Sequence, residues 1–207
     1  MQIYVLPLLL SISMLLSANV FAQRSDVIEL PAPKMTGGMP VFDAIAARQS
    51  TKAYSDKEVS LQDLSTILWA AYGFNRPDMR VIPTPRNQQQ LSVYVFLKNA
   101  VYLYDAKANK LYKKADGDHR RLVGGQEYVY VAPVNLLFVA DGAKGAGTGS
   151  HISVGCASQN IYHACVALEL STVIRSSGID AEKLRPLLKL AETDEFIAAQ
   201  TVGYKSE

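Results

Sequence analysis

Residues 82–96 read Ile82-Pro83-Thr84-Pro85-Arg86-Asn87-Gln88-Gln89-Gln90-Leu91-Ser92-Val93-Tyr94-Val95-Phe96, so prolines and polar side chains run directly into an apolar segment. The two prolines hold the backbone extended and exclude a helix. The β-branched and aromatic residues after position 90 predict a buried strand. The polar side chains thus stand at the entrance to a rigid strand, where they either cap a turn or face a ligand.

The length and composition indicate one globular domain. The chain has 207 residues, of which 49% are hydrophobic and 19% charged, with a formal net charge of +2. This length suits a single domain. A nucleic-acid-binding protein needs a clearly basic face, which this charge balance does not predict. We therefore expect no nucleic acid among its binding partners.

Residues 1–22 have the character of an export signal. The segment from Ile3 to Leu16 is almost entirely apolar, and Ala22 supplies the small residue of a cleavage site, although no positive charge precedes the apolar segment. A membrane-spanning helix needs about 20 apolar residues, and Pro7 interrupts this one. We expect cleavage after Ala22, a periplasmic or otherwise exported protein, and no stable membrane insertion after cleavage. An uncleaved anchor is the alternative.

The rest of the chain predicts an arm followed by one domain. Residues 23–40 are rich in Pro and Gly and predict an N-terminal arm or linker, and residues 41–207 form the domain. Periodicity and turn signals predict helices over 41–47, 60–71, 152–173 and 180–190, a hairpin over 100–112, and strands over 134–139 and 196–202. Ser60 and Asp63 form the expected capping pair of the second helix.

The two cysteines, Cys156 and Cys165, fall in the long helix. Nine residues apart on a helix, they would lie about 13 Å apart and on opposite faces. A disulfide does not reach so far. We expect small, buried, unpaired side chains.

Arg48, Ser50 and Lys52 follow the first helix at alternate positions. In an extended segment the three side chains share one face. Two cations and a hydroxyl suit a phosphate or another anion. A solvated, charged turn is the alternative.

Five motifs in order carry a resemblance to a known family. They are Arg-x-Ser-x-Lys at 48–52, Pro-Thr-Pro-Arg-Asn-x-Gln at 83–89, Ser-Gln-Asn-Ile-Tyr at 158–162, Leu-x-Thr-Val at 170–173 and Val-Gly-Tyr at 202–204. With these motifs the chain resembles the FMN-dependent nitroreductase family, in its small exported branch, over about residues 41–204.

The resemblance implies a set of cofactor-binding residues. Arg48, Gln49, Ser50 and Lys52 would hold the FMN phosphate, the ribityl chain and the pyrimidine edge of the ring. Pro83, Thr84, Pro85, Arg86 and Asn87 would line the flavin from a second segment, and Gln159 and Asn160 match the helix beside the cofactor. Backbone N–H groups near Ile174, Ser176 and Ser177 would face flavin N5 and O4.

The chemistry implied by the resemblance belongs to the cofactor. Two-electron reduction leaves negative charge on the N1–C2=O2 edge of the flavin, which Lys52 or Arg86 would stabilise. The protein supplies orientation and charge, so no side-chain nucleophile is expected. The three histidines lack metal-ligand spacing, so no metal is expected.

Two departures from the family pattern bear on these expectations. The family usually has Gly-Leu-Gly where this chain has Glu169-Leu170-Ser171. Many members also carry a basic C-terminal extension that reaches the phosphate, whereas only Lys205 follows the last motif here. These departures bear on phosphate affinity and subunit contacts.

The resemblance implies an α+β fold with a mainly antiparallel sheet between helices and a long central helix. It also implies a homodimer and ping-pong hydride transfer through flavin N5, from a small-molecule electron donor to a nitroaromatic, quinone or similar acceptor. The alternatives are a specialised flavin dehydrogenase or dehalogenase, and an FMN-binding or electron-transfer protein without turnover.

Overall fold

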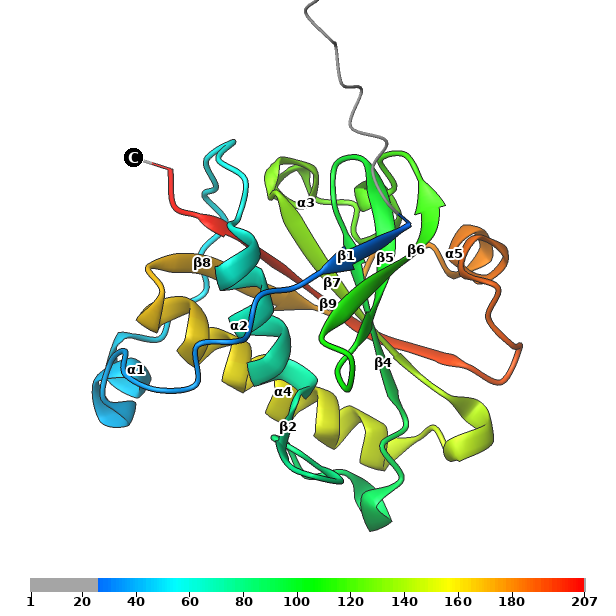
Figure 1. Cartoon of the computed structure of the whole chain (residues 1–207). Coiled ribbons are helices and arrows are strands. Elements are labelled where there is room, and N and C mark those ends of the chain that lie inside the picture. The colour runs from blue at the N-terminus through cyan, green and yellow to red at the C-terminus, as the bar shows by residue number, and fades with distance from the viewer. Residues whose placement is uncertain (1–25, 207) are drawn as a thin grey trace, which may run out of the picture.

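The computed structural model describes residues 26–206, so the predicted signal peptide (1–22) lies outside the described residues. An antiparallel sheet of seven strands runs through the molecule in the order β1-β6-β5-β4-β7-β9-β8 (Figure 1). Its strands are β1 (Val27–Glu29), β4 (Leu91–Phe96), β5 (Ala100–Asp105), β6 (Lys110–Asp116), β7 (Val134–Ala140), β8 (Leu170–Arg175) and β9 (Glu195–Tyr204). A separate hairpin joins β2 (Phe74–Arg76) to β3 (Met79–Arg80).

Helices cover both faces of the sheet, which confirms the predicted α+β class. They are α1 (Val41–Ala47), α2 (Leu61–Tyr72), α3 (Glu127–Val131), α4 (Thr148–Ala167) and α5 (Ala181–Leu188), with short 3₁₀ turns η1 (Pro85–Asn87), η2 (Arg120–Val123) and η3 (Gly142–Lys144). The helices α2 and α4 pack on one face, and α3 and α5 pack on the other. None of the helices in residues 26–206 has the length and apolarity needed to cross a membrane.

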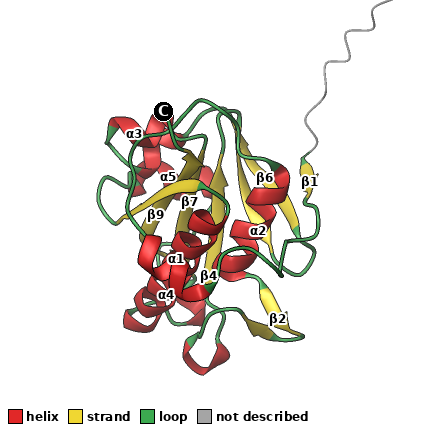
Figure 2. Ribbon diagram, turned by 90° about the vertical axis from the view of Figure 1, so that its left-hand side faces the viewer, coloured by secondary structure: helices red, strands yellow, loops and turns green. Residues whose placement is uncertain are grey.

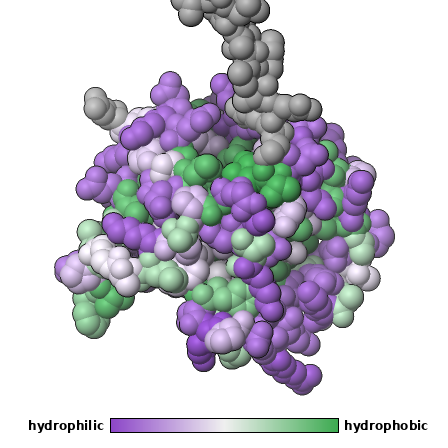
Figure 3. All heavy atoms as spheres, viewed as in Figure 1, coloured by the Kyte–Doolittle hydropathy of each residue, from purple (hydrophilic) through white to green (hydrophobic). Residues whose placement is uncertain are grey.

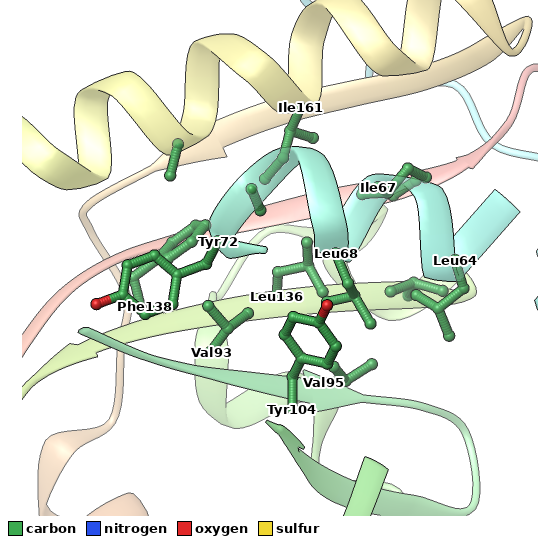
Figure 4. Packing of buried hydrophobic residues seen from close by; sticks show 14 of the residues in the cluster. Leu64, Ile67, Leu68, Tyr72, Val93, Val95, Tyr104, Leu136, Phe138 and Ile161 are labelled. Carbon is green, nitrogen blue, oxygen red and sulfur yellow. The ribbon is translucent and has the colours of Figure 1, made fainter. Parts of the chain in front are cut away.

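Alternate side chains of β4 serve the two cores. Val93 and Val95 pack toward α2 and α4, whereas Tyr94 and Phe96 pack toward α3 and α5. This is the period of two that a strand buried on both faces requires. Figure 4 shows the first of these cores, where side chains of α2 lie over β4, β5 and β7, with Ile161 of α4 beside them.

Several predicted elements agree with the structure. The helix over 41–47 has the predicted bounds. Ser60 caps α2, because its Oγ accepts a hydrogen bond from the Asp63 N–H at 3.0 Å. The hairpin of β5 and β6 is present. Cys165 is buried and unpaired as expected, while the unpaired Cys156 is half-buried.

The predicted long helix over 152–173 is wrong at both ends. The helix α4 begins at Thr148 and ends at Ala167, and residues 170–175 form β8, which pairs with β9. Glu169 separates the two elements with a φ of 58°. A left-handed residue ends a helix, and this one lies in an apolar segment that lacks the usual glycine signal.

The N-terminal arm is fixed to the domain. Within it, β1 pairs with β6, an element that the Pro- and Gly-rich composition does not predict. Further along, the carbonyl of Pro31 accepts from Ser65 Oγ at 2.6 Å, and the Lys34 N–H donates to Thr66 Oγ1 at 3.1 Å. The arm thus crosses α2 before it reaches α1.

Candidate functional site

The segment after α1 brings its polar residues onto two tyrosines. Ser50 Oγ lies 2.8 Å from the hydroxyl of Tyr162, and the guanidinium of Arg48 lies 5.2 Å from the centre of the same ring. Lys52 Nζ lies 5.5 Å from the centre of the Tyr128 ring. We call these five residues the first cluster. It contains two cations and three hydroxyls on an accessible edge of the molecule.

The segment that carries Arg48, Ser50 and Lys52 continues beside β8 and β9. The Thr51 N–H donates to the Thr172 carbonyl at 3.1 Å, and the Ser55 N–H donates to the Tyr204 carbonyl at 2.9 Å. Between them, the Tyr54 hydroxyl lies 2.5 Å from Thr201 Oγ1. Burial raises the pKa of Tyr54 well above its usual value, so it stays neutral. Lys205 follows Tyr204 and is therefore at the far end of this segment from the first cluster.

Pro83, Thr84, Pro85, Arg86 and Asn87 form a second cluster at the start of α4. Ser153 Oγ donates to the Pro83 carbonyl at 3.1 Å. Gly149 of α4 lies so close to this segment that a Cβ there would be 2.4 Å from Pro85 Cγ. The prolines are thus seated directly on α4.

The second cluster has an unusual backbone. Arg86, Asn87 and Gln89 have φ values of 48°, 54° and 49°. Non-glycine residues seldom adopt this left-handed region, and such conformations gather where a loop is held for a ligand. The Gln89 side chain is held by Arg80 Nε at 3.0 Å and itself donates to the Asp78 carbonyl at 2.8 Å.

The two clusters lie at different ends of α4. Tyr162 and Ser153 are nine residues apart, which is about 13 Å along the helix axis and half a rotation around it. Between them runs an accessible stripe of Ile152, Cys156 and Gln159. The sequence predicts one flavin site from both segments, but within one chain they flank opposite edges of this stripe.

Several predicted residues are not members of either cluster, although Ile174 contacts the first one. Asn160 is turned toward α2, where its Nδ2 donates to the Ala70 carbonyl at 3.0 Å, and Gln159 contacts His163 at 2.8 Å. The Ile174 N–H lies within β8 and donates to the Tyr162 hydroxyl at 3.2 Å. Three others, Gln49, Ser176 and Ser177, are exposed, the two serines just beyond the end of β8.

Sequence reasoning missed the role of Tyr162 and the position of Arg175. Tyr162 belongs to the 158–162 motif, so the motif itself was the available signal. Arg175 is buried, and it donates from Nε to the Val123 carbonyl and from Nη2 to Asn135 Oδ1, at 2.9 and 2.8 Å. Burial lowers the pKa of Arg175 to about 10. A basic residue in an apolar strand was the signal here.

These groups suit an organic anion better than a metal. Arg48, Ser50 and Lys52 offer charge and hydrogen bonds, and Tyr162 and Tyr128 offer aromatic surface. In addition, Arg175 Nη1 is buried without a hydrogen-bond partner among the described residues. A phosphorylated aromatic cofactor such as FMN matches this set. Residues 26–206 contain no group of three His, Cys, Asp or Glu placed to hold a metal ion.

Comparison with known proteins supports one assignment. A crystal structure from Ralstonia eutropha JMP134, provisionally named a nitroreductase, is 32% identical, with a TM-score of 0.80 over 88% of this chain and 91% of that one. Another provisionally named nitroreductase, from Desulfovibrio desulfuricans and solved in complex with FMN, is 26% identical, with a TM-score of 0.62 over 83% and 89% of the two chains. A curated relative from Methanocaldococcus jannaschii with the same provisional name is 25% identical over 81% of this chain and 92% of its own.

The family model described as the nitroreductase family matches residues 45–204, which include both clusters and the whole of α4. This range is most of the chain. The protein belongs to the nitroreductase family.

Proposed function

We propose that the protein is an FMN-dependent oxidoreductase that passes electrons by ping-pong hydride transfer to a nitroaromatic, quinone or similar acceptor. The observation that carries the proposal is the convergence of Arg48, Ser50 and Lys52 on two aromatic rings. The FMN complex of the Desulfovibrio relative supports the choice of cofactor. When bound, FMN supplies the hydride chemistry at N5, and the protein supplies orientation and charge.

Each part of the first cluster has a distinct task in this proposal. Arg48 binds the phosphate by charge-assisted hydrogen bonds, and Ser50, oriented by Tyr162, binds the ribityl chain or the phosphate. Lys52 stands over Tyr128 and stabilises the negative charge of the reduced pyrimidine edge. Ser176 and Ser177 are exposed, so their backbone N–H groups would face the ring.

We further propose that a second copy of the chain completes each site. The helix α1 presents Val41, Phe42 and Ile45 to solvent with 59%, 80% and 51% exposure, and only Ala44 of this helix is buried. This helix packs beside α4 on the outer side of the molecule (Figure 2) and forms an apolar projection on the surface (Figure 3, lower left). An apolar surface of this kind marks an interface.

The positions of the two clusters along α4 support this proposal. If the accessible stripes of two α4 helices pack antiparallel about a two-fold axis, the C-terminal half of each lies beside the N-terminal half of the other. The first cluster of one chain then stands level with the second cluster of its partner. The separation of about 13 Å within one chain thereby becomes proximity between chains.

Anaerobic reconstitution with FMN tests the function. We expect the purified protein to bind FMN, and a nitroaromatic to reoxidise the reduced protein rapidly. The Lys52→Met variant should bind FMN with a lower reduction potential, whereas Lys57→Met should not change it, because Lys57 lies over Tyr204, at the far end of the 48–55 segment. Bound FMN without reoxidation would indicate a binding or electron-transfer protein. A protein that takes up no flavin contradicts the proposal.

We also propose that the protein is exported. The reason is the apolar segment from Ile3 to Leu16 with a small residue at Ala22. Mass spectrometry of the protein expressed with its N-terminus intact should find Gln23 as the first residue. A mature protein that retains Met1 rules out cleavage.

A further inference from the structure

Arg175 is a buried cation without a counter-charge. It is 7% exposed, and the two groups that accept its hydrogen bonds, the Val123 carbonyl and Asn135 Oδ1, are both neutral. Its Nη1 has no partner, and within residues 26–206 no carboxylate forms an ion pair with it. A buried charge is costly unless it is paired. The folded chain therefore retains this charge for a reason that its own contacts do not supply.

Arg120 is a second buried arginine, and unlike Arg175 it has a carboxylate partner. It is 4% exposed, and Asp118 engages its guanidinium at 2.9 and 2.7 Å. Its Nη1 donates to the Ala132 carbonyl at 2.9 Å. Burial is similar for the two arginines, so the missing carboxylate is specific to Arg175.

Arg175 lies directly behind the proposed flavin-facing backbone. Successive side chains of β8 alternate in direction. The Ile174 N–H meets the Tyr162 hydroxyl of the first cluster, while Arg175 enters the opposite side of the sheet. Tyr128 and Tyr54 lie near Arg175, and Lys52 of the first cluster lies 5.5 Å from the centre of the Tyr128 ring.

The chain is shaped to hold the guanidinium in this place. At Gly124 a Cβ would lie 2.3 Å from Arg175 Nε, so a larger residue would displace the side chain. At Gly178, with a φ of 77°, a Cβ would lie 2.8 Å from the backbone nitrogen of Gly125. These close approaches leave Arg175 buried where Gly124 and Gly125 meet the loop that follows β8. Water therefore screens its charge little, and its field extends to the neighbouring site.

We propose that Arg175 is a second cation that stabilises the reduced, anionic flavin, acting through the backbone end of β8 rather than by direct contact. The inference rests on the proposed function. A hydride brings two electrons and one proton to the flavin and leaves one negative charge on the N1–C2=O2 edge. That charge is the counter-charge that Arg175 lacks. Arg175 is a positioning residue for this charge, since it does not touch the reacting atoms.

The test compares variants that keep or remove the charge. In Arg175→Gln the side chain still reaches a polar partner but is neutral, and in Arg175→Lys the charge remains. We expect Gln to weaken the binding of reduced FMN relative to oxidised FMN at least tenfold, which lowers the two-electron potential by about 30 mV. Lys should retain most of the wild-type value. The matched control, Asp118→Asn with Arg120→Gln, removes a neutralised arginine and should leave the potential unchanged.

The outcomes separate this inference from the proposed function. Wild-type protein that takes up no FMN overturns both. FMN bound normally, with equal potentials in wild type and Arg175→Gln, overturns only the role of Arg175 and leaves it a structural side chain. If Arg175→Gln does not fold, a pH titration of the reduced Lys52→Met variant decides, because in the wild type Lys52 would keep the flavin anionic without Arg175. We expect its flavin spectrum to remain anionic below the pH at which free reduced FMN becomes protonated, and protonation at the same pH as free FMN contradicts the inference.

Discussion

Glu169 occupies a backbone position that suits glycine. It follows the C-cap of α4 with a φ of 58°, and its N–H donates to the Val166 carbonyl at 3.2 Å. A left-handed conformation costs a residue with a Cβ about 1–2 kcal/mol. The chain therefore bears a local strain at Glu169.

Replacing Glu169 by Gly should therefore stabilise the protein. The expected gain is about 1 kcal/mol, after allowing for the greater freedom of Gly in the unfolded chain. For a protein of this size that gain raises the melting temperature by roughly 2–4 °C. Urea unfolding and calorimetry measure both quantities. Glu182→Gly, within α5, is the control and should lose about 1 kcal/mol; a loss of stability in Glu169→Gly as well would rule out the strain.

The same residue shows where the sequence could not predict an element. The segment 166–173 contains neither Gly nor Pro and is mostly apolar, so a helical pattern continues through it without a stop signal. The break depends on pairing between β8 and β9, whose partners are some 30 residues apart. Local pattern was sufficient for α1 and for the Ser60 cap of α2, because those signals lie within the elements themselves.

At the scale of elements, the sequence predicts the residues of the candidate site but not how the elements bring them together. The composition of segments 48–52 and 83–87 predicts anion and ligand contacts, and the structure places each segment on α4 or beside it. Their separation along α4 could not be predicted, because it depends on how distant elements pack. Arg175 could not be placed for the same reason, since its partners Val123 and Asn135 come from other elements.

The second cluster is held by an arginine from the β2–β3 hairpin. The guanidinium of Arg80 lies 4.0 Å from the ring centres of both Tyr72 and Phe74. It donates to the Tyr72 carbonyl at 2.8 Å and to Gln89 Oε1 at 3.0 Å, while the Tyr72 hydroxyl accepts from the Leu91 N–H. One side chain thus connects α2 to the strained loop at the start of β4.

Arg80→Met should release this loop. Loss of the stacked cation and of two charge-assisted hydrogen bonds should lower the free energy of unfolding by about 2 kcal/mol. Amide hydrogen exchange over residues 85–90 should also become faster, which a global loss of stability alone would not confine to this loop. The matched control is Arg76→Met, because Arg76 is exposed and its side chain donates a hydrogen bond to that of its neighbour Asn75. Equal exchange rates in Arg80→Met and wild type would show that the loop holds its conformation without Arg80.

At the scale of the whole molecule, the two faces of the sheet differ in how much apolar surface their helices leave exposed. Beneath α3 and α5, Val123, Val129 and Leu184 are fully buried. On the side of α2 and α4 the core is also closed, but α1 lies outside it with its apolar side chains exposed. The helix α4 adds Ile152, which is 63% exposed. Of the five large apolar side chains in residues 26–206 that are more than half exposed, four therefore belong to α1 and α4.

The oligomeric state decides whether this face joins two chains. Burying a side chain such as Phe42 or Ile45 contributes roughly 2 kcal/mol, and a two-fold axis uses each residue twice. We expect light scattering at micromolar concentration to find a dimer, and Phe42→Asp with Ile45→Asp to yield a folded monomer. Because each site then lacks its second cluster, this monomer should bind FMN far more weakly.

The control is Val131→Asp. Val131 is an exposed apolar residue of α3 on the other side of the sheet, so this variant should leave both the dimer and FMN binding intact. A wild-type monomer with full flavin occupancy would mean that one chain builds the whole site, and the 13 Å between its clusters would then have to be spanned by the cofactor alone.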